Sequence, residues 1–337
     1  MKIGGLFINK KLLILLVTLC FILSIFIVSA SDNNSTNENT DNLTIENEHN
    51  FQKLNENRNY KSVSKSINFP NFSNLFNFNN GYGYWVWSSD MYKVDFDQLE
   101  KNGVKYIFLN SYAFTEHGQR EVLDWIKEAN AHGIEVHIWM QIFNTGEWIS
   151  PLKNGTPNTA YFNYKIEEAR YYAGLEGVSG ILIDYVRFKG NAYKYENGSE
   201  AITLFVKMFS TEMRKVNPNL KLSMTVMPEG DKDNYYYGQN IPVISQYVDV
   251  IIPMMYKGNY KENSSWIENT TKWFVKNSKA EVWSGIQTYK SDFNTTPLPA
   301  SEITKDANLC FKGGAKGVVL FKWGMNKAVD NNKLKID

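Results

Sequence analysis

The stretch Val178-Ser-Gly-Ile-Leu-Ile-Asp184-Tyr-Val-Arg-Phe188 carries the features that decide the fold. Its first six residues are small or aliphatic and almost wholly apolar, which is typical of a strand buried on both faces of a parallel sheet. Asp184 stands where the apolar run stops, and Tyr185 and Arg187 follow it. Polar groups at the carboxyl end of a buried strand are typical of active sites in α/β barrels, where the βα loops begin. We therefore expect Asp184 to lie at the centre of a functional site.

The same alternation of apolar runs and amphipathic segments extends from residue 81 onward. Strands are predicted at residues 82–87, 104–110, 135–142, 180–185, 221–227, 248–255, 281–288 and 317–323. Helices are predicted at 116–132, 161–175, 199–216, 265–276 and 301–311, and glycines at their ends favour left-handed C-caps. Eight such units in about 250 residues predict a single (β/α)8 TIM barrel of the α/β class. A doubly wound open sheet is the alternative, but no Gly-x-Gly-x-x-Gly loop follows the first strand.

Residues 1–30 have the pattern of an export signal. Two lysines precede an apolar run from Leu12 to about Val28, and the small residues around Ala30 are typical of signal-peptide cleavage. The run nearly reaches the roughly 20 residues of a membrane span, so an uncleaved N-terminal anchor is the second interpretation. Both predict a protein that is secreted or anchored to the outer face of the cell membrane. The composition of residues 31–80 predicts a low-complexity, disordered linker. The barrel is predicted at residues 81–328, and a C-terminal tail at residues 329–337.

Composition narrows the possible partners. The net charge of the 337 residues is +1, so no basic excess favours nucleic-acid binding. The aromatic content of 15% fits both a sugar-binding site and a barrel core. Cys310 is the single cysteine of the exported part, so no intramolecular disulfide is expected there. We predict no cofactor and no metal site, because His117 and His137 lack nearby ligand partners. The oligomeric state is left open.

Several strand ends carry polar or aromatic residues that would meet at one rim. Side chains alternate along a strand, so Asp184 shares a face with Gly180 and is expected to point into the barrel mouth. Glu229 stands just beyond the fifth strand. The candidates for substrate contacts are Trp85, Gln141, Tyr185, Arg187, Tyr256, Gln287 and Trp323. The parity of Lys322 opposes that of Trp323, so Lys322 is expected to face away from the mouth.

Two segments resemble a known family. Residues 180–188 resemble the Asp-Tyr-[Ile/Val]-Arg-[Phe/Tyr] signature of the putative glycosyl-hydrolase-like barrel proteins, and residues 248–256 are similar to their sixth strand. More distantly, Met254-x-Tyr256 and Trp323 are similar to strand ends of family 18 chitinases. The resemblance covers roughly residues 81–324 and implies a (β/α)8 barrel that cleaves glycosidic bonds. Against the chitinase motif Asp-x-x-Asp-x-Asp-x-Glu, however, Val186 stands where the catalytic Glu would be, so chitinase chemistry is not implied. The seventh strand also lacks the terminal carboxylate typical of many retaining barrel glycosidases.

The sequence therefore predicts an extracellular or cell-surface glycoside hydrolase that acts on a cell-wall or surface polysaccharide. Such cleavage usually needs two carboxyl groups, and Asp184 and Glu229 are the predicted catalytic pair. Glu229 is assigned as the acid because it follows apolar residues, and partial desolvation would raise its pKa. Asp184 would be the nucleophile or base, held charged by Arg187 or Tyr256. The alternative function is a non-catalytic carbohydrate-binding surface protein on the same scaffold, in which a salt bridge between Asp184 and Arg187 only closes the mouth.

Overall fold

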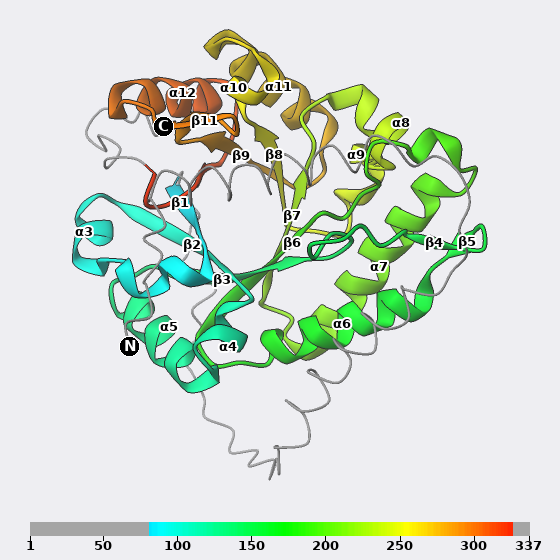
Figure 1. Cartoon of the computed structure of the whole chain (residues 1–337), viewed down its shortest axis with the longest axis horizontal. Helices are drawn as coiled ribbons and strands as arrows, with labels where there is room; N and C mark the ends of the chain where they lie inside the picture. Colours follow the sequence, from blue (N-terminus) through cyan, green and yellow to red (C-terminus); the bar gives the residue numbers. More distant parts are fainter. Residues whose placement is uncertain (1–80, 326–337) are drawn as a thin grey trace, which may run out of the picture. The chain divides into compact units, whose positions relative to one another are not determined.

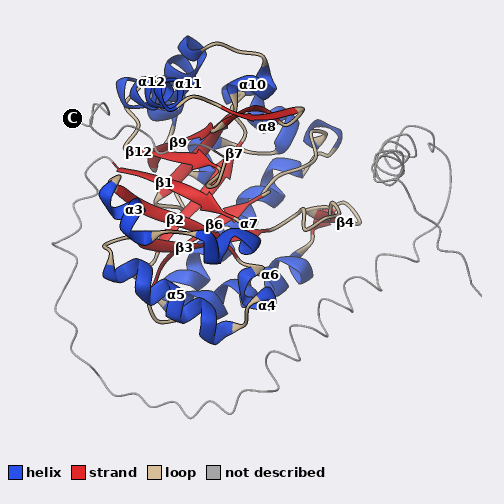
Figure 2. Ribbon diagram, turned by 60° about the vertical axis from the view of Figure 1, so that its left-hand side comes forward, coloured by secondary structure: helices blue, strands red, loops and turns tan. Residues whose placement is uncertain are grey.

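Eight parallel strands close into a barrel in the computed structural model, which describes residues 81–325. The strand order is β1-β12-β9-β8-β7-β6-β3-β2, and helices surround the strands (Figures 1 and 2). The barrel strands are β1 (Gly81–Val86), β2 (Val104–Asn110), β3 (Glu135–Gln141), β6 (Val178–Asp184), β7 (Lys221–Val226), β8 (Val250–Met255), β9 (Glu281–Gln287) and β12 (Gly317–Phe321). The predicted barrel is confirmed. The predictions for residues 1–80, and for the tail from 329 on, lie outside the described residues.

The helices follow the strands as a βα repeat requires. They are α3 (Phe96–Lys101), α4 (Ala113–Glu116), α5 (Gln119–Ala131), α6 (Thr159–Ala173), α7 (Gly198–Val216), α8 (Asp233–Tyr237), α9 (Ile241–Ile244), α10 (Lys257–Tyr260), α11 (Ser264–Asn277) and α12 (Ala300–Lys312), with 3-10 turns η3 (Ser88–Lys93), η4 (Ala192–Lys194) and η5 (Gly230–Lys232). The five longest match the predicted helices. Gly103, Gly133, Gly177 and Gly314 have φ between 69° and 96°, as a left-handed C-cap requires.

Two short hairpins extend the loops at the carboxyl ends of the strands. Strands β4 (Leu152–Lys153) and β5 (Thr156–Pro157) follow β3, and strands β10 (Tyr289–Ser291) and β11 (Asn294–Pro297) follow β9. The sequence did not predict either hairpin, because neither segment has a sustained period-2 pattern. Both belong to the side of the barrel on which Asp184 ends β6.

The barrel interior is filled by large rings. Its buried cluster consists of Trp85, Tyr106, Phe108, Trp139, Leu182, Val250, Ile252, Trp283 and Val319. Glycine makes room for this packing: a Cβ on Gly180 would lie 2.4 Å from Nδ1 of His137, and one on Gly285 would lie 3.1 Å from Trp85. Gly180 therefore faces the crowded interior, as predicted. Every second residue of β6 after it, Leu182 and then Asp184, faces the same way.

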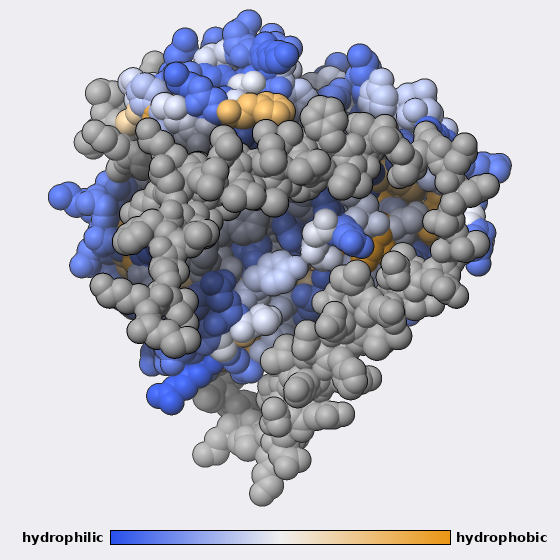
Figure 3. Space-filling model, viewed as in Figure 1, coloured by the Kyte–Doolittle hydropathy of each residue, from blue (hydrophilic) through white to orange (hydrophobic). Residues whose placement is uncertain are grey.

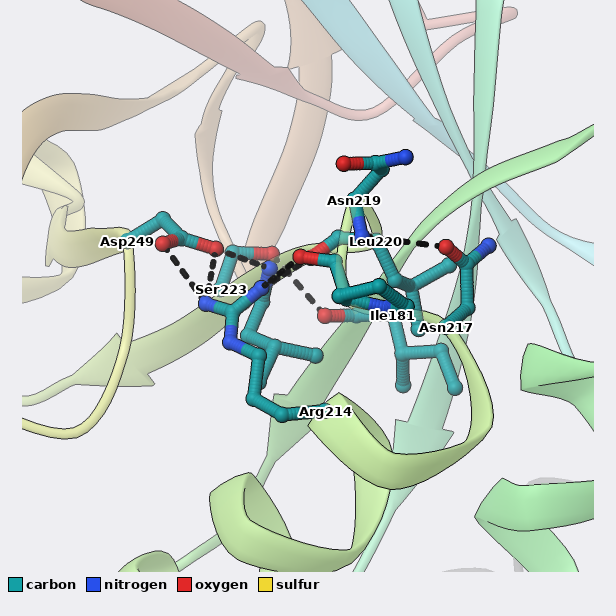
Figure 4. A network of polar contacts seen from close by, with 9 residues as sticks. Ile181, Arg214, Asn217, Asn219, Leu220, Ser223 and Asp249 are labelled. Atoms are coloured by element: carbon teal, nitrogen blue, oxygen red, sulfur yellow. Dashed lines mark hydrogen bonds and ion pairs between the residues drawn. The ribbon is translucent and has the colours of Figure 1, made fainter.

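A polar network holds the amino ends of β7 and β8, at the opposite end from the mouth (Figure 4). Nη2 of Arg214 donates to both carboxylate oxygens of Asp249 at 2.7 Å, and Nη1 donates to the Leu220 carbonyl at 2.6 Å. The Leu222 amide donates to Asp249 at 2.7 Å. This bidentate pair joins α7 to the β7–β8 edge. Asp249 therefore has a structural role at the amino end of β8.

The outer surface is mostly polar. Where Figure 3 shows the described residues, hydrophilic side chains dominate the helical ring, as amphipathic helices around a barrel predict. Within residues 81–325, no helix combines the length and the apolar character that crossing a bilayer would need. Cys310 is a buried free thiol.

Candidate functional site

Asp184 lies inside the barrel mouth with its side chain almost fully buried; the residue is 6% exposed. Its Oδ1 accepts the hydroxyl of Thr225 and the Tyr185 amide, the latter at 2.7 Å. Its Oδ2 accepts Nε1 of Trp139 at 3.0 Å. Trp139 and Thr225 belong to β3 and β7, the two strands that flank β6. Neighbouring strands therefore fix both oxygens of the carboxyl group.

The surroundings of Asp184 act on its proton affinity in opposite directions. Burial raises the pKa of the Asp184 carboxyl group above its ordinary value, while the three hydrogen bonds and the charge of Arg187 lower it. Burial is the larger effect, so the group binds a proton more tightly than an exposed aspartate. A carboxyl group with a raised pKa in a cleft is suited to donating a proton.

Arg187 lies among aromatic rings rather than against a carboxylate. Its guanidinium carbon is 4.7 Å from the ring centre of Trp148, 5.2 Å from that of Tyr185 and 5.5 Å from that of Tyr237. Nη1 donates to the Phe188 carbonyl at 3.1 Å. Within residues 81–325 no carboxylate forms an ion pair with Arg187, so the salt bridge considered for Asp184 is not present. The guanidinium stacks on rings at the rim, where cation–π contacts hold it.

Glu229 has a different set of polar contacts from Asp184. Its Oε1 accepts the hydroxyls of Tyr237 at 2.8 Å and Tyr260 at 3.1 Å, and its amide donates to Asp233 at 3.1 Å. Burial, followed by the charge of Glu229, raises the pKa of Asp233 to about 9. Glu229 Oε2 and Asp233 Oδ2 are both buried, and each lacks a donor among the described residues. A proton held by Asp233 supplies the donor that these two oxygens otherwise lack.

A third carboxylate gathers polar groups above the end of β9. Asp292, in the turn between β10 and β11, accepts the Tyr289 hydroxyl at 2.9 Å, Nε2 of Gln287 at 3.3 Å and Nδ2 of Asn259 at 2.7 Å. Oε1 of Gln287 is buried without a partner among residues 81–325. Asp292 could not be recognised from the sequence, because a lone aspartate in a polar loop is typical of a turn residue.

Two tyrosines lie in the electrostatic field of both Asp184 and Asp292. Burial raises the pKa of Tyr185 and of Tyr256, and the negative charges of both Asp184 and Asp292 raise each of them further. Tyr256 stacks on Phe321 of β12 with ring centres 5.4 Å apart. Tyr185 has φ 55°, a left-handed conformation uncommon for a residue with a side chain, directly after Asp184. The two tyrosines lie within the electrostatic reach of both aspartates.

Two of the predicted rim positions need correction, and so does the expected direction of Lys322. Trp85 is 1% exposed and belongs to the interior core, so its side chain is closed to a ligand. Trp323 is half-buried and packs against the outer core, because β12 ends at Phe321 and its side-chain alternation does not continue. Phe321 occupies the interior position instead. Lys322, expected to face away, reaches Asp90 with Nζ at 3.3 Å and lies 6.0 Å from the ring of Trp87.

Gln141 and Gln287 end their strands as predicted. Gln141 is the last residue of β3, is half-buried and lies in register with Asp184. Gln287 is the last residue of β9 and is 3% exposed. The ring centre of Trp87, which directly follows β1, is 4.7 Å from that of Trp139. The structure therefore brings Asp184, Tyr185, Tyr256, Gln287 and Gln141 to one end of the barrel.

One group of possible metal ligands occurs within residues 81–325, and it is away from the mouth. Nδ1 of His132 is 2.8 Å from Glu100 and 3.8 Å from Asp97. Asp97 and Glu100 are exposed on α3, and His132 caps the carboxyl end of α5. The hydrogen bond to Glu100 raises the pKa of His132. The group is therefore a surface ion-pair cluster between two helices.

Comparison with known proteins gives a family and a fold. The model of the family described as "Putative glycosyl hydrolase domain" matches residues 112–290, more than half of the chain, including Asp184 and Glu229. No curated protein matches the sequence significantly. Among solved structures, a class V chitinase from Pseudomonas fluorescens has a TM-score of 0.59 at 14% identity, covering 76% of this chain and 98% of that chain.

Two further structures are similar. A chitinase from Chromobacterium violaceum has a TM-score of 0.57 at 14% identity, with coverage of 76% and 98%. The spore cortex-lytic enzyme SleL from Bacillus megaterium has a TM-score of 0.53 at 10% identity, with coverage of 76% and 73%. At such low identity these similarities establish the barrel fold and leave the choice of catalytic groups to the geometry of this chain.

Proposed function

We propose that this chain, which belongs to the family described as a putative glycosyl hydrolase domain, hydrolyses O-glycosidic bonds in a cell-wall or surface polysaccharide. The observation that carries the proposal is the buried carboxyl group of Asp184 at the barrel mouth, with its raised pKa. Barrel enzymes carry their catalytic groups at this end of the strands. The family supplies the reaction class, and Asp184 supplies a group suited to it.

In this proposal Asp184 is the proton donor. Its proton passes to the glycosidic oxygen while the bond from that oxygen to the anomeric carbon breaks, and the electron pair stays on the oxygen. Thr225 and Trp139 hold the carboxyl group in place throughout. This reverses the assignment expected from the sequence, in which Glu229 was the acid, because burial acts on Asp184 whereas Asp233 holds the shared proton beside Glu229.

A second carboxyl group must enter the reaction charged, to activate water or attack the sugar. Glu229 is the partner that the sequence proposes. The hydroxyls of Tyr237 and Tyr260 donate hydrogen bonds to its carboxyl group. Its catalytic role stays a prediction, as do substrate contacts by Tyr185, Tyr256 and Arg187. Gln141 and Gln287 are proposed to hydrogen-bond sugar hydroxyls.

The substrate and location are proposed at the level of class. The similar structures are named chitinases and a spore cortex-lytic enzyme, which makes wall polymers the first to screen. The apolar segment before Ala30 supports export, with the barrel secreted or held at the outer face of the membrane. The proposed partner is then a polysaccharide. The membrane is a second partner if the apolar N-terminal segment is not cleaved.

The conservative variant Asp184→Asn tests the reaction. We expect the wild type to release reducing ends from one member of a panel of chitin, peptidoglycan and capsular glycans. Loss of the proton donor should lower that rate about 10²–10⁴-fold. Near-UV circular dichroism must show an unchanged fold, since Asn presents an amide where Trp139 now donates. Undiminished hydrolysis by Asp184→Asn would refute the assignment.

The second candidate function is carbohydrate binding without turnover. One observation favours it: three donors already satisfy the carboxyl group of Asp184, as in a structural residue. The same panel separates the two functions. A wild type that binds a glycan tightly and releases no reducing ends from it is a binding protein.

A further inference from the structure

We infer that Asp292 is the second catalytic carboxylate of this cleft, and that the β10–β11 hairpin supplies the acidic group that the end of the seventh barrel strand lacks. This inference rests on the proposed glycoside hydrolysis. It assigns to Asp292 the charged role that the proposed function leaves to Glu229, and it adds a residue that lies beyond the span matched by the family model.

The position of Asp292 follows from Gln287. Along β9, Trp283 belongs to the interior cluster and a Cβ on Gly285 would touch interior Trp85, so Gln287 shares the interior face at the strand's carboxyl end. Nε2 of Gln287 donates to Oδ1 of Asp292 at 3.3 Å. The hairpin therefore folds back until its turn lies over the end of the strand that precedes it.

Two contacts with the loop after β8 fix the hairpin. Asn259 pairs with Asp292 twice: its Oδ1 accepts the Asp292 amide at 2.8 Å, and its Nδ2 donates to the carboxylate at 2.7 Å. Gly258 packs against the hairpin backbone so closely that a Cβ there would lie 1.6 Å from the Lys290 carbonyl oxygen. The carboxylate is thus held by a built scaffold rather than by a free loop.

The two aspartates have complementary environments. Asp184 is buried, while Asp292 is exposed and accepts hydrogen bonds from three neutral donors. Tyr185 and Tyr256 lie in the field of both. Glu229 instead accepts the hydroxyls of Tyr237 and Tyr260. One buried acid and one solvated carboxylate at the same end of the barrel are the pair of groups that glycosidic cleavage requires.

The reaction balances with these two groups. Asp184 gives its proton to the glycosidic oxygen as the bond to the anomeric carbon breaks. Asp292 takes a proton from a water molecule, whose oxygen forms the new bond to that carbon. Asp184 ends charged and Asp292 ends protonated, and exchange with solvent restores both. Attack by water on the face opposite the leaving group inverts the anomeric configuration.

The experiment compares Asp292→Asn with Glu229→Gln and with Asp231→Asn, an exposed aspartate of the same rim that serves as the matched control. We expect Asp292→Asn to lower kcat about 10²–10⁴-fold, Glu229→Gln to lower it less, and Asp231→Asn to leave it unchanged. If Asp292→Asn retains activity, the inference about Asp292 is overturned, while the proposed glycoside hydrolysis stands. A wild type without turnover on the panel overturns the proposed function, and with it the catalytic role.

A second measurement does not depend on turnover. The carboxyl carbon of Asp184, labelled with ¹³C and assigned by its loss in Asp184→Asn, is titrated by NMR. If Asp292 faces Asp184, removal of its negative charge by Asp292→Asn shifts the pKa of Asp184 downward, and Asp231→Asn does not. An Asp184 titration that is the same in Asp292→Asn and in the wild type overturns the inference, because the two groups then do not share a cleft.

Discussion

Gly258 is the position where one methyl group tests the placement of the hairpin. In Gly258→Ala the new Cβ would lie 1.6 Å from the Lys290 carbonyl oxygen, whereas such contacts are essentially never shorter than 3.0 Å. The obstacle is backbone, so the hairpin must withdraw by about 1.4 Å. A displacement of about 1 Å in a catalytic group costs on the order of 10²-fold in rate. We therefore expect kcat to fall about 100-fold while the barrel stays folded.

Two measurements check this expectation. Reducing-end release gives kcat, and hydrogen exchange at the Asp292 amide reports its bond to Asn259, which should open in the variant. Gly174→Ala is the matched control: Gly174 caps α6, and its Cβ would meet nothing closer than 3.6 Å. Wild-type kcat together with an intact Asp292 amide in Gly258→Ala would refute the reasoning about the hairpin.

Two predictions concern pH. Thr225→Val removes a hydrogen-bond donor that favours the charged form of Asp184, so the pKa of Asp184 should rise. The basic limb of the pH profile of kcat/KM should then move to higher pH. A basic limb at the same pH as in the wild type contradicts the assignment of Asp184 as the acid. Asp233 has a folded pKa of about 9 against an ordinary 3.8, so between these values the folded state holds a proton that the unfolded state has released. The free energy of unfolding then falls as pH rises, by at most about 1.4 kcal/mol per pH unit. Asp233→Asn can keep both contacts to Glu229, and it should remove this pH dependence. Urea unfolding from pH 5 to 8 measures it, and equal slopes in the two proteins count against the shared proton.

The barrel could be predicted because its strands are nearly continuous apolar runs. Each run is short, buried on both faces and closed by a polar or glycine-rich segment, so the strand ends came within two residues of those observed. The direction of Asp184 followed from the same logic, since Gly180 can only face a crowded interior. Local pattern was sufficient wherever the fold repeats.

The rest of the site depends on contacts between distant segments. Asp292 joins the site through Asn259 and Gln287, and no periodicity in a polar loop encodes such a meeting. Trp323 was misjudged because side-chain alternation was extended past Phe321, where β12 ends. Arg187 looked like an ion-pair partner, but three rings brought together from separate loops surround it instead. In each case tertiary packing decided what spacing alone could not.

The rings that fill the barrel interior close the mouth from below, so solvent reaches it from one side. Phe108 and Trp283 are 0% exposed and Trp85 is 1% exposed, so this floor leaves no path for water through the barrel axis. Any proton that Asp184 gives away must be replenished from the solvent above it. A bound sugar would then block the access of solvent to Asp184. The carboxyl group would regain its proton only after the product has left.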